Sequence, residues 1–182
     1  MQECEVISQV VDLLLQGNIG AIFKGKAEMG SRALGNRSII ADPRLVNGKD
    51  LVNNIKHREW YRPFAASILL EEASNWFEMG KLKDSPWMLY AFPVKKTKGE
   101  RIPAVIHVDN TCRIQTVTKS QGKYYDLIKY FFSKTGVPLI LNTSLNLAGD
   151  PLVHTKTDAI KLLNDSSLDF IYFADEELIR KF

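Results

Sequence analysis

The sequence lacks the features of secreted, membrane-spanning or disulfide-stabilised proteins. Its 182 residues include only two cysteines, Cys4 and Cys112, which form no CxxC pair and no disulfide framework. No apolar run approaches the roughly 18 residues that cross a bilayer. The first residues, MQECEVISQVVDLLLQG, have no basic segment typical of a signal peptide, and there are no repeats or low-complexity tracts. We therefore expect one cytoplasmic domain over residues 1–182, with no membrane contact.

A large net charge is also missing, since the chain carries a formal charge of only +3. The charges are unevenly placed, because residues 24–62 hold nine Lys or Arg and four acidic residues, a local balance of +5. The rest of the chain is slightly acidic. Such an asymmetry can guide an anionic ligand to one face, although a solvated basic surface is the simpler interpretation of charge alone.

Hydrophobic periodicity predicts helices and short strands that interleave along the chain. The expected helices cover residues 4–16, 47–57, 71–77, 124–133 and 159–163, the last capped by Thr157. The expected strands cover residues 19–23, 38–41, 65–70, 87–94, 104–108, 113–117, 138–141 and 168–173. Residues 25–36 should form a loop, with room for a short helix around Ala33, and residues 142–144 a polar loop. Because several strands are adjacent in sequence, we expect a mixed sheet covered by helices.

The first segment of functional interest is GKAEMGSRALGNRS at residues 25–38. Its glycines let the backbone approach a ligand closely, and Arg32 and Arg37 could each fork onto phosphate oxygens. The spacing matches neither a Walker A loop nor GxGxxG. A surface loop whose arginines pair with Glu28 and Asp42 is an equally good interpretation.

The second segment, KHREWYRPF at residues 56–64, places four potential cations among three aromatic residues. Lys56 and Arg62 lie about 240° apart on an ideal helix, so they converge on one ligand only if the helix ends between them. Pro63 favours such an end. The alternatives are a helix C-terminus with favourable cations and a surface for single-stranded nucleic acid.

The third segment, HVDNTCRIQTV at residues 107–117, contains an arginine on a strand. Alternation places Arg113, Gln115 and Val117 on one face, where the arginine requires a carboxylate or a phosphate partner. His107 and Asp109 could bind a metal, but two residues do not make a metal site.

The fourth segment, LILNTSLN at residues 139–146, is an apolar strand that ends in amides and hydroxyls. Asn142, Thr143, Ser144 and Asn146 would lie at a sheet edge, where α/β proteins often bind ligands. No nearby histidine supplies Ser144 with a general base. We therefore interpret Ser144 as a phosphate or carbonyl ligand and not as a nucleophile.

In this order, four phrases resemble the C-terminal domain of the O-carbamoyltransferase family, which includes the nodulation-factor, cephamycin and tobramycin carbamoyltransferases. The phrases are GSRALGNRSIIADPR, IKHREWYRPFAAS, HVDNTCRIQTV and TGVPLILNTSLNLAGDPLV, and the resemblance runs from about residue 20 to residue 173. It departs at Met29, Ser31 and Asp150, where the family commonly has tryptophan, proline and glutamate. The resemblance implies a YrdC-like α/β fold, a mixed twisted sheet covered by helices.

The resemblance also implies a function. In this family the domain is understood to convert carbamoyl phosphate and ATP into carbamoyl-adenylate, with Mg²⁺ bound mainly by the substrate phosphates and no protein metal site. A separate N-terminal domain of the Kae-like, ASKHA type then transfers the carbamoyl group to an acceptor hydroxyl. We expect that domain in the full-length protein or in a partner subunit. Carried over residue by residue, the resemblance assigns catalytic roles to Arg32, Lys56, Arg62 and Ser144, and binding roles to Arg113, Asn142, Asn146, His57 and Arg58.

Two other functions remain open from the sequence. The shared fold would suit a threonylcarbamoyl-adenylate synthase that uses threonine, bicarbonate and ATP. The basic and aromatic region at residues 24–62 would suit a non-catalytic RNA-binding module, although we do not expect nucleic acid as a partner.

Overall fold

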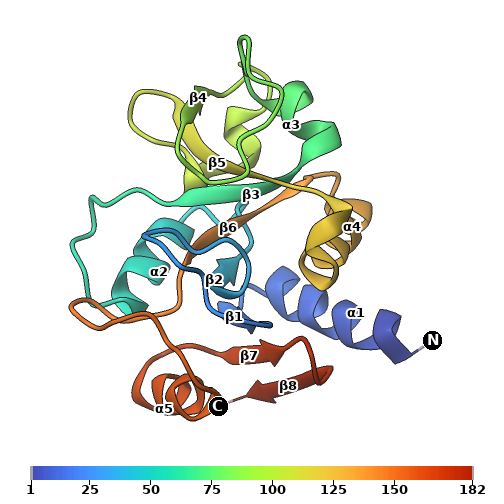
Figure 1. The fold of residues 1–182 in the computed structure, drawn as a ribbon. Helices are drawn as coiled ribbons and strands as arrows, with labels where there is room; N and C mark the ends of the chain where they lie inside the picture. The colour runs from blue at the N-terminus through green and yellow to red at the C-terminus, as the bar shows by residue number, and fades with distance from the viewer. Residues whose placement is uncertain (1, 182) are drawn as a thin grey trace.

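The computed structural model describes residues 2–181, with side chains from residue 5 onward, and its core is an eight-stranded mixed sheet (Figure 1). The strand order is β4-β5-β3-β6-β2-β1-β7-β8. The strands are β1 (Gly20–Phe23), β2 (Arg37–Ala41), β3 (Ala65–Leu69), β4 (Ala91–Pro93), β5 (Thr111–Val117), β6 (Leu139–Ser144), β7 (Phe170–Phe173) and β8 (Leu178–Lys181). The α-helices are α1 (Gln2–Leu15), α2 (Gly48–Ile55), α3 (Leu70–Trp76), α4 (Lys123–Thr135) and α5 (Lys156–Asp165), and the short 3₁₀ helices are η1 (Gly99–Arg101), η2 (Pro103–Val105) and η3 (Lys119–Gln121). The predicted mixed α/β fold is confirmed.

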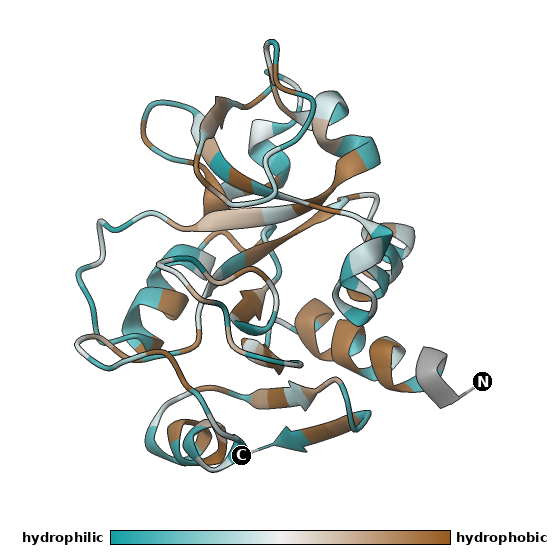
Figure 2. Ribbon diagram, in the orientation of Figure 1, coloured by the Kyte–Doolittle hydropathy of each residue, from teal (hydrophilic) through white to brown (hydrophobic). Residues whose placement is uncertain are grey.

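Strand pairing explains why the sheet is mixed. Strand β1 runs antiparallel to β2 and parallel to β7, and β3 runs parallel to β5. Strand β6 lies antiparallel between β2 and β3. Every residue of β1, β2 and β3 is buried, so these strands are covered on both faces. Figure 2 shows the brown apolar residues concentrated on the strands and on helix α1.

Helices α1 and α4 lie side by side and pack on each other (Figure 1). Val10, Val11 and Leu14 form the fully buried stripe of α1 that the helical spacing predicts. Helix α4 ends at Gly136, whose φ of 66° makes the left-handed cap for which glycine is suited. Tyr124 lies in the first turn of α4, and its ring contacts the loop at residues 25–36. The contact at Gly35 is so close that a side chain at that position would collide with the ring.

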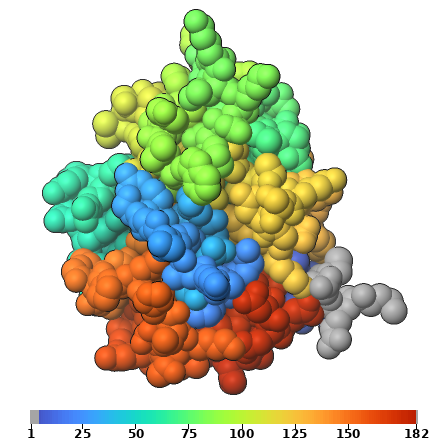
Figure 3. Space-filling view, in the orientation of Figure 1, coloured from blue at the N-terminus to red at the C-terminus, as the bar shows by residue number. Residues whose placement is uncertain are grey.

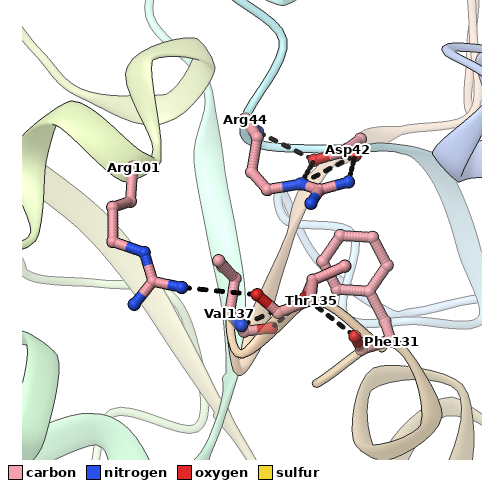
Figure 4. Close-up of polar contacts among 6 residues, drawn as sticks. All are labelled: Asp42, Arg44, Arg101, Phe131, Thr135 and Val137. Carbon is pink, nitrogen blue, oxygen red and sulfur yellow. Dashed lines mark hydrogen bonds and ion pairs between the residues drawn. The ribbon is translucent and has the colours of Figure 1, made fainter. Parts of the chain in front are cut away.

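Figure 4 shows two polar contacts that join loops to α4 and its neighbours. Arg44 Nη2 lies 2.6 Å from Asp42 Oδ2, and the Arg44 guanidinium lies 5.6 Å from the centre of the Phe131 ring. Arg101 donates to the Thr135 carbonyl at 3.3 Å, at the C-terminal end of α4. Asp42 therefore pairs with Arg44, and the alternative in which it pairs with an arginine of the 25–38 segment is wrong.

One predicted strand, over residues 104–108, is wrong, and another, over residues 87–94, is too long. Residues 104–108 begin with η2, because Pro103 opens a 3₁₀ turn in which the Ala104 N–H donates to the Pro43 carbonyl at 3.1 Å. The apolar residues there are buried by a turn and not by sheet pairing. Within residues 87–94, the strand that pairs with β5 is β4. Trp87 and Leu89 precede it and are exposed.

Four boundaries or elements also differ from the sequence prediction. No helix forms around Ala33, and β6 continues through residues 142–144 because β2 pairs with it there. Thr155, not Thr157, caps α5, and its Oγ1 accepts the Asp158 N–H at 3.1 Å. Strand β8, which pairs with β7, was not predicted because most of its residues are exposed.

Gly20 in β1 is required by the packing of β7. A Cβ at this position would lie 2.1 Å from the fully buried Phe170 ring. We expect Gly20→Ala to lower the free energy of unfolding by about 1–3 kcal/mol, as overpacked cores do, in urea denaturation. Gly30→Ala is the control because a Cβ there meets nothing within 4 Å. Equal stability of the two variants would contradict this packing.

Candidate functional site

A small cavity lies over strands β3, β5 and β6. Ala65 of β3 is the register partner of both Arg113 of β5 and Asn142 of β6, so the three residues form a row on one face of the sheet. The short Ala65 side chain leaves space between its two longer neighbours. The cavity has a volume of about 120 Å³, and Arg32, Arg58 and Ser144 also line it.

Three arginines reach this cavity, and no carboxylate lines it. Arg32 Nε, Arg58 Nη2 and Arg113 Nε are buried and have no hydrogen-bond partner among the described residues. Burial lowers the pKa of Arg58 to about 10, and the positive charges of Arg62 and Arg113 add to the effect. Burial and the charge of Arg32 lower the pKa of Arg113. Half-buried arginines that repel one another and keep buried nitrogens without acceptors favour the binding of an anion.

Glu28 shapes the loop that brings Arg32 to the cavity. Its Oε1 accepts the backbone N–H groups of Leu34 at 2.7 Å and Asn36 at 2.8 Å. Figure 3 shows this loop, in blue, near the centre of the face in view, next to the green segment of residues 75–100. Through Oε1, the carboxylate thus holds the backbone of the loop.

We expect Glu28→Ala to loosen this loop. Losing hydrogen bonds to a charged acceptor costs about 1.5–3 kcal/mol each, so local opening should become at least about tenfold more frequent. Limited trypsin digestion measures this as faster cleavage after Lys26 or Arg32. Glu100→Ala, at an exposed acidic residue of η1, is the matched control. Identical cleavage of Glu28→Ala and wild type would show that Glu28 does not hold the loop.

Arg37 has a structural role, and its proposed role as a phosphate ligand is wrong. The side chain is buried and lies 3.4 Å from the centre of the Phe23 ring. Its guanidinium donates to four backbone carbonyls, those of Lys24, Asn36, Gly25 and His154. These bonds tie the start of the loop to a distant segment of the chain.

The buried Lys56 and the half-buried Ser144 and Asn146 form a hydrogen-bonded cluster beside the cavity. Lys56 Nζ donates to the Ser144 carbonyl at 2.6 Å, the Asn146 carbonyl at 2.8 Å and Asn146 Oδ1 at 3.0 Å. The Ser144 hydroxyl donates to Asn146 Oδ1 at 2.6 Å. Burial, followed by the charges of Arg58 and Arg62, lowers the pKa of Lys56 to about 7. Lys56 therefore holds the loop after β6 in place and does not itself line the cavity.

A buried network that the sequence did not reveal underlies the cavity. The Tyr124 hydroxyl donates to Ser67 Oγ at 2.8 Å, and Ser67 donates to Gln115 Oε1 at 2.7 Å. Asn142 Nδ2 donates to Ser67 Oγ at 2.8 Å. Alternation along the strand could have found Gln115, which shares a face with Arg113. No sequence signal points to Ser67 or Tyr124, whose positions depend on strand register and helix packing.

A larger hollow of about 650 Å³ adjoins the cavity, and Ser31 and Arg32 line both. Its other walls include Met29, Trp87 and Leu89, three largely exposed apolar residues. A volume of this size and a mixed apolar and polar lining suit a ligand larger than a phosphate.

Neither a metal cluster nor a membrane span is found in the part of the chain that the structure describes. Among the side chains of residues 5–181, no three His, Cys, Asp or Glu gather closely enough to hold an ion. The helices within residues 2–181 are too short or too polar to cross a bilayer.

Comparison with known proteins decides the family. The family model described as Carbamoyltransferase C-terminus matches residues 11–181. This chain belongs to that family. Nodulation protein NolNO of Sinorhizobium fredii (strain NBRC 101917 / NGR234) is 40% identical over 173 residues, which are 93% of this chain and 25% of that protein. Nodulation protein NolO of Bradyrhizobium diazoefficiens is 41% identical over 168 residues, 91% of this chain and 31% of that protein. The chain thus spans only a quarter to a third of these relatives.

Solved structures show the fold of this carbamoyltransferase C-terminal domain. Full-length HypF in its phosphate- and nucleotide-bound form superposes with a TM-score of 0.59 at 18% identity, covering 88% of this chain and 20% of that one. A variant of P. abyssi Sua5 has a TM-score of 0.59 at 14% identity, covering 87% of this chain and 43% of that one. These likenesses confirm the predicted YrdC-like fold.

In this carbamoyltransferase C-terminal domain, the predicted site residues fall into three groups according to where they lie relative to the cavity. Those that line the cavity are Arg32, Arg58, Arg113, Asn142 and Ser144. Lys56 and Asn146 lie beside it and hold Ser144. Arg62 and His57 are exposed; Arg62 Nη1 lies 3.7 Å from Glu59 Oε2, and neither residue lines the cavity. Helix α2 ends at Ile55, two residues earlier than the predicted end at residue 57, and neither Lys56 nor Arg62 lines the cavity.

Proposed function

We propose that this domain forms carbamoyl-adenylate from carbamoyl phosphate and ATP, for transfer to an acceptor hydroxyl by a separate N-terminal domain of the Kae-like type. The observation that supports this most strongly is the cavity lined by three arginines and no carboxylate. Membership of a carbamoyltransferase family supplies the reaction class.

The proposed reaction brings polyanions together, and the arginines reduce their repulsion. The phosphate of carbamoyl phosphate leaves as inorganic phosphate with consumption of one water. The resulting carbamate oxygen attacks the α-phosphorus of ATP, and pyrophosphate departs. Arg32, Arg58 and Arg113 would neutralise the negative charge that gathers at each step. Chemistry of this kind needs positioning and charge stabilisation more than a nucleophilic side chain.

The two hollows have different sizes and linings, which suggests how the substrates share them. At about 120 Å³, the arginine cavity suits a small acyl phosphate, whereas the hollow of about 650 Å³ suits the nucleoside part of ATP. The Trp87 indole in the larger hollow offers an aromatic face for a base. Mg²⁺ would be bound mainly by the nucleotide phosphates, which need few protein ligands.

Pyrophosphate release from ATP by the purified domain tests this function. Release should require carbamoyl phosphate, ATP and Mg²⁺ together, and omission of any one should return it to background. No release from a folded domain would contradict adenylate formation by this chain alone.

The same assay separates the two alternative functions. Release that depends on threonine and bicarbonate and ignores carbamoyl phosphate would indicate a threonylcarbamoyl-adenylate synthase. An RNA-binding module would instead retain RNA without releasing pyrophosphate, with an affinity that falls steeply as salt rises.

A further inference from the structure

Asn142 carries an unused hydrogen-bond acceptor beside the three arginines. The residue lines the arginine cavity and is only 1% exposed, and its Oδ1 has no partner among the described residues. A buried carbonyl oxygen without a donor costs free energy, so its persistence calls for an explanation. A fully ionised phosphate group cannot satisfy it, because its oxygens are all acceptors and negatively charged. The group that fits this oxygen is an N–H or O–H donor attached to an anion.

The surrounding network fixes which atom of the Asn142 amide is bonded to the protein and which is left without a partner. Asn142 Nδ2 lies 3.1 Å from the Ala33 carbonyl oxygen, 2.8 Å from Ser67 Oγ and 3.2 Å from Gln115 Oε1, so these three acceptors share its two hydrogens. A flipped amide would place its oxygen against two carbonyl oxygens. Gln115 cannot flip to relieve this clash, because its own Nε2 donates to the Leu34 carbonyl at 2.9 Å.

Ser67 also opposes a flip of the Asn142 amide, because its hydroxyl already makes every hydrogen bond it can. It accepts from Tyr124 and from Asn142 and donates to Gln115, so no hydrogen is left to satisfy a flipped Asn142 oxygen. The network therefore fixes the amide nitrogen on its protein partners, and the oxygen is left as the unpartnered polar atom of a residue that lines the cavity.

We infer that Asn142 Oδ1 accepts a hydrogen bond from the –NH₂ of a carbamoyl group whose phosphate is held by the arginines. Asn142 is then a specificity-determining residue that distinguishes carbamoyl phosphate from other acyl phosphates, and Ser67 and Gln115 are positioning residues that act through it. This inference rests on the proposed function, since it assumes that carbamoyl phosphate enters this cavity.

Acetyl phosphate provides a direct test because a methyl group of similar size replaces the –NH₂ and removes the donor. A site built around a hydrogen bond rejects an analogue that lacks it. In calorimetric titrations, wild type should bind acetyl phosphate at least about tenfold more weakly than carbamoyl phosphate. Equal affinity for the two would overturn the role of Asn142 while leaving the proposed function intact. If neither acyl phosphate binds, the proposed function fails, and the inference fails with it.

Variants locate the source of the discrimination. Asn142→Ala should bring the affinity ratio of the two acyl phosphates close to one, and Ser67→Ala should reduce it several-fold. Both should retain affinity for inorganic phosphate within about threefold, which a collapsed cavity would not. Ser85→Ala is the control, because Ser85 is also a buried serine that donates to a backbone carbonyl, at 3.0 Å, but lies outside the cavity. An unchanged ratio in Asn142→Ala would overturn the inference.

Discussion

Replacing Arg113 with alanine should reduce carbamoyl-adenylate formation by about 10²–10³-fold while the domain remains folded. This is the loss typical of removing one preorganised donor that stabilises developing negative charge. Arg113 lies in the row with Ala65 and Asn142 on the cavity floor, and its buried Nε has no partner among the described residues. Pyrophosphate release under saturating ATP measures the effect.

The unfolding temperature of the same variant, unlike its activity, should not fall. Arg32 lies close enough to Arg113 to lower its pKa, so the two positive charges repel each other in the unliganded domain. Removing one of them relieves this repulsion, and the unfolding temperature of Arg113→Ala should equal or exceed that of wild type. Arg180→Ala, at an exposed arginine of the edge strand β8, should alter neither property. Near-normal turnover of Arg113→Ala would mean that the arginine cavity is not the reaction site.

Lys56→Met should lower the free energy of unfolding by about 2–4 kcal/mol. The substitution leaves the carbonyls of Ser144 and Asn146 and the Asn146 amide oxygen without their buried donor, and each such loss is costly. Because these groups belong to the end of β6 and the loop after it, where Ser144 lines the cavity, the same variant should also lose adenylate formation. Lys81→Met, at an exposed lysine in a loop, is the matched control in urea denaturation.

The effect of Lys56 should depend on pH in a defined direction. Its pKa is about 7 in the folded domain against an ordinary value of 10.5 for an unfolded lysine. Between these values the unfolded chain binds more protons, so the contribution of Lys56 to the free energy of unfolding rises as pH rises from about 7 to 10.5. Below pH 7 the cost of burying the charge is present in full. Relative to Lys56→Met, wild type should therefore gain stability across this window, and a constant difference would contradict the lowered pKa.

Much of the fold was predictable because apolar periodicity is a local signal. The buried stripe of α1 and the fully buried strands β1, β2 and β3 all follow from it. The failures occur where tertiary contacts override local preference. The 104–108 segment is as apolar as a strand, but Pro103 starts η2, which takes up its first two residues. Residues 142–144 are polar yet pair with β2.

The site was predictable only in part. The sequence shows which residue types are present, but which side chains meet at one cavity depends on the fold. Arg32, Arg58 and Arg113 come from three distant segments, and the family resemblance correctly brought those segments together. The sequence could not show that the Arg37 donors are used by backbone carbonyls, or that Arg62 is exposed and near Glu59.

The remaining site features depend on the alignment of the strands. Ser67, Gln115 and Asn142 meet only because β3 lies between β5 and β6 in a particular register. A shift of one residue would turn Ser67 to the other face.

The most direct test of the central claim is to identify the product by mass spectrometry. The folded domain, incubated with ATP, Mg²⁺ and carbamoyl phosphate and then quenched rapidly, should yield carbamoyl-adenylate in equal amount to the pyrophosphate released. Omission of carbamoyl phosphate should abolish both signals. Consumption of ATP to ADP or AMP without any carbamoyl-adenylate would contradict the proposed function.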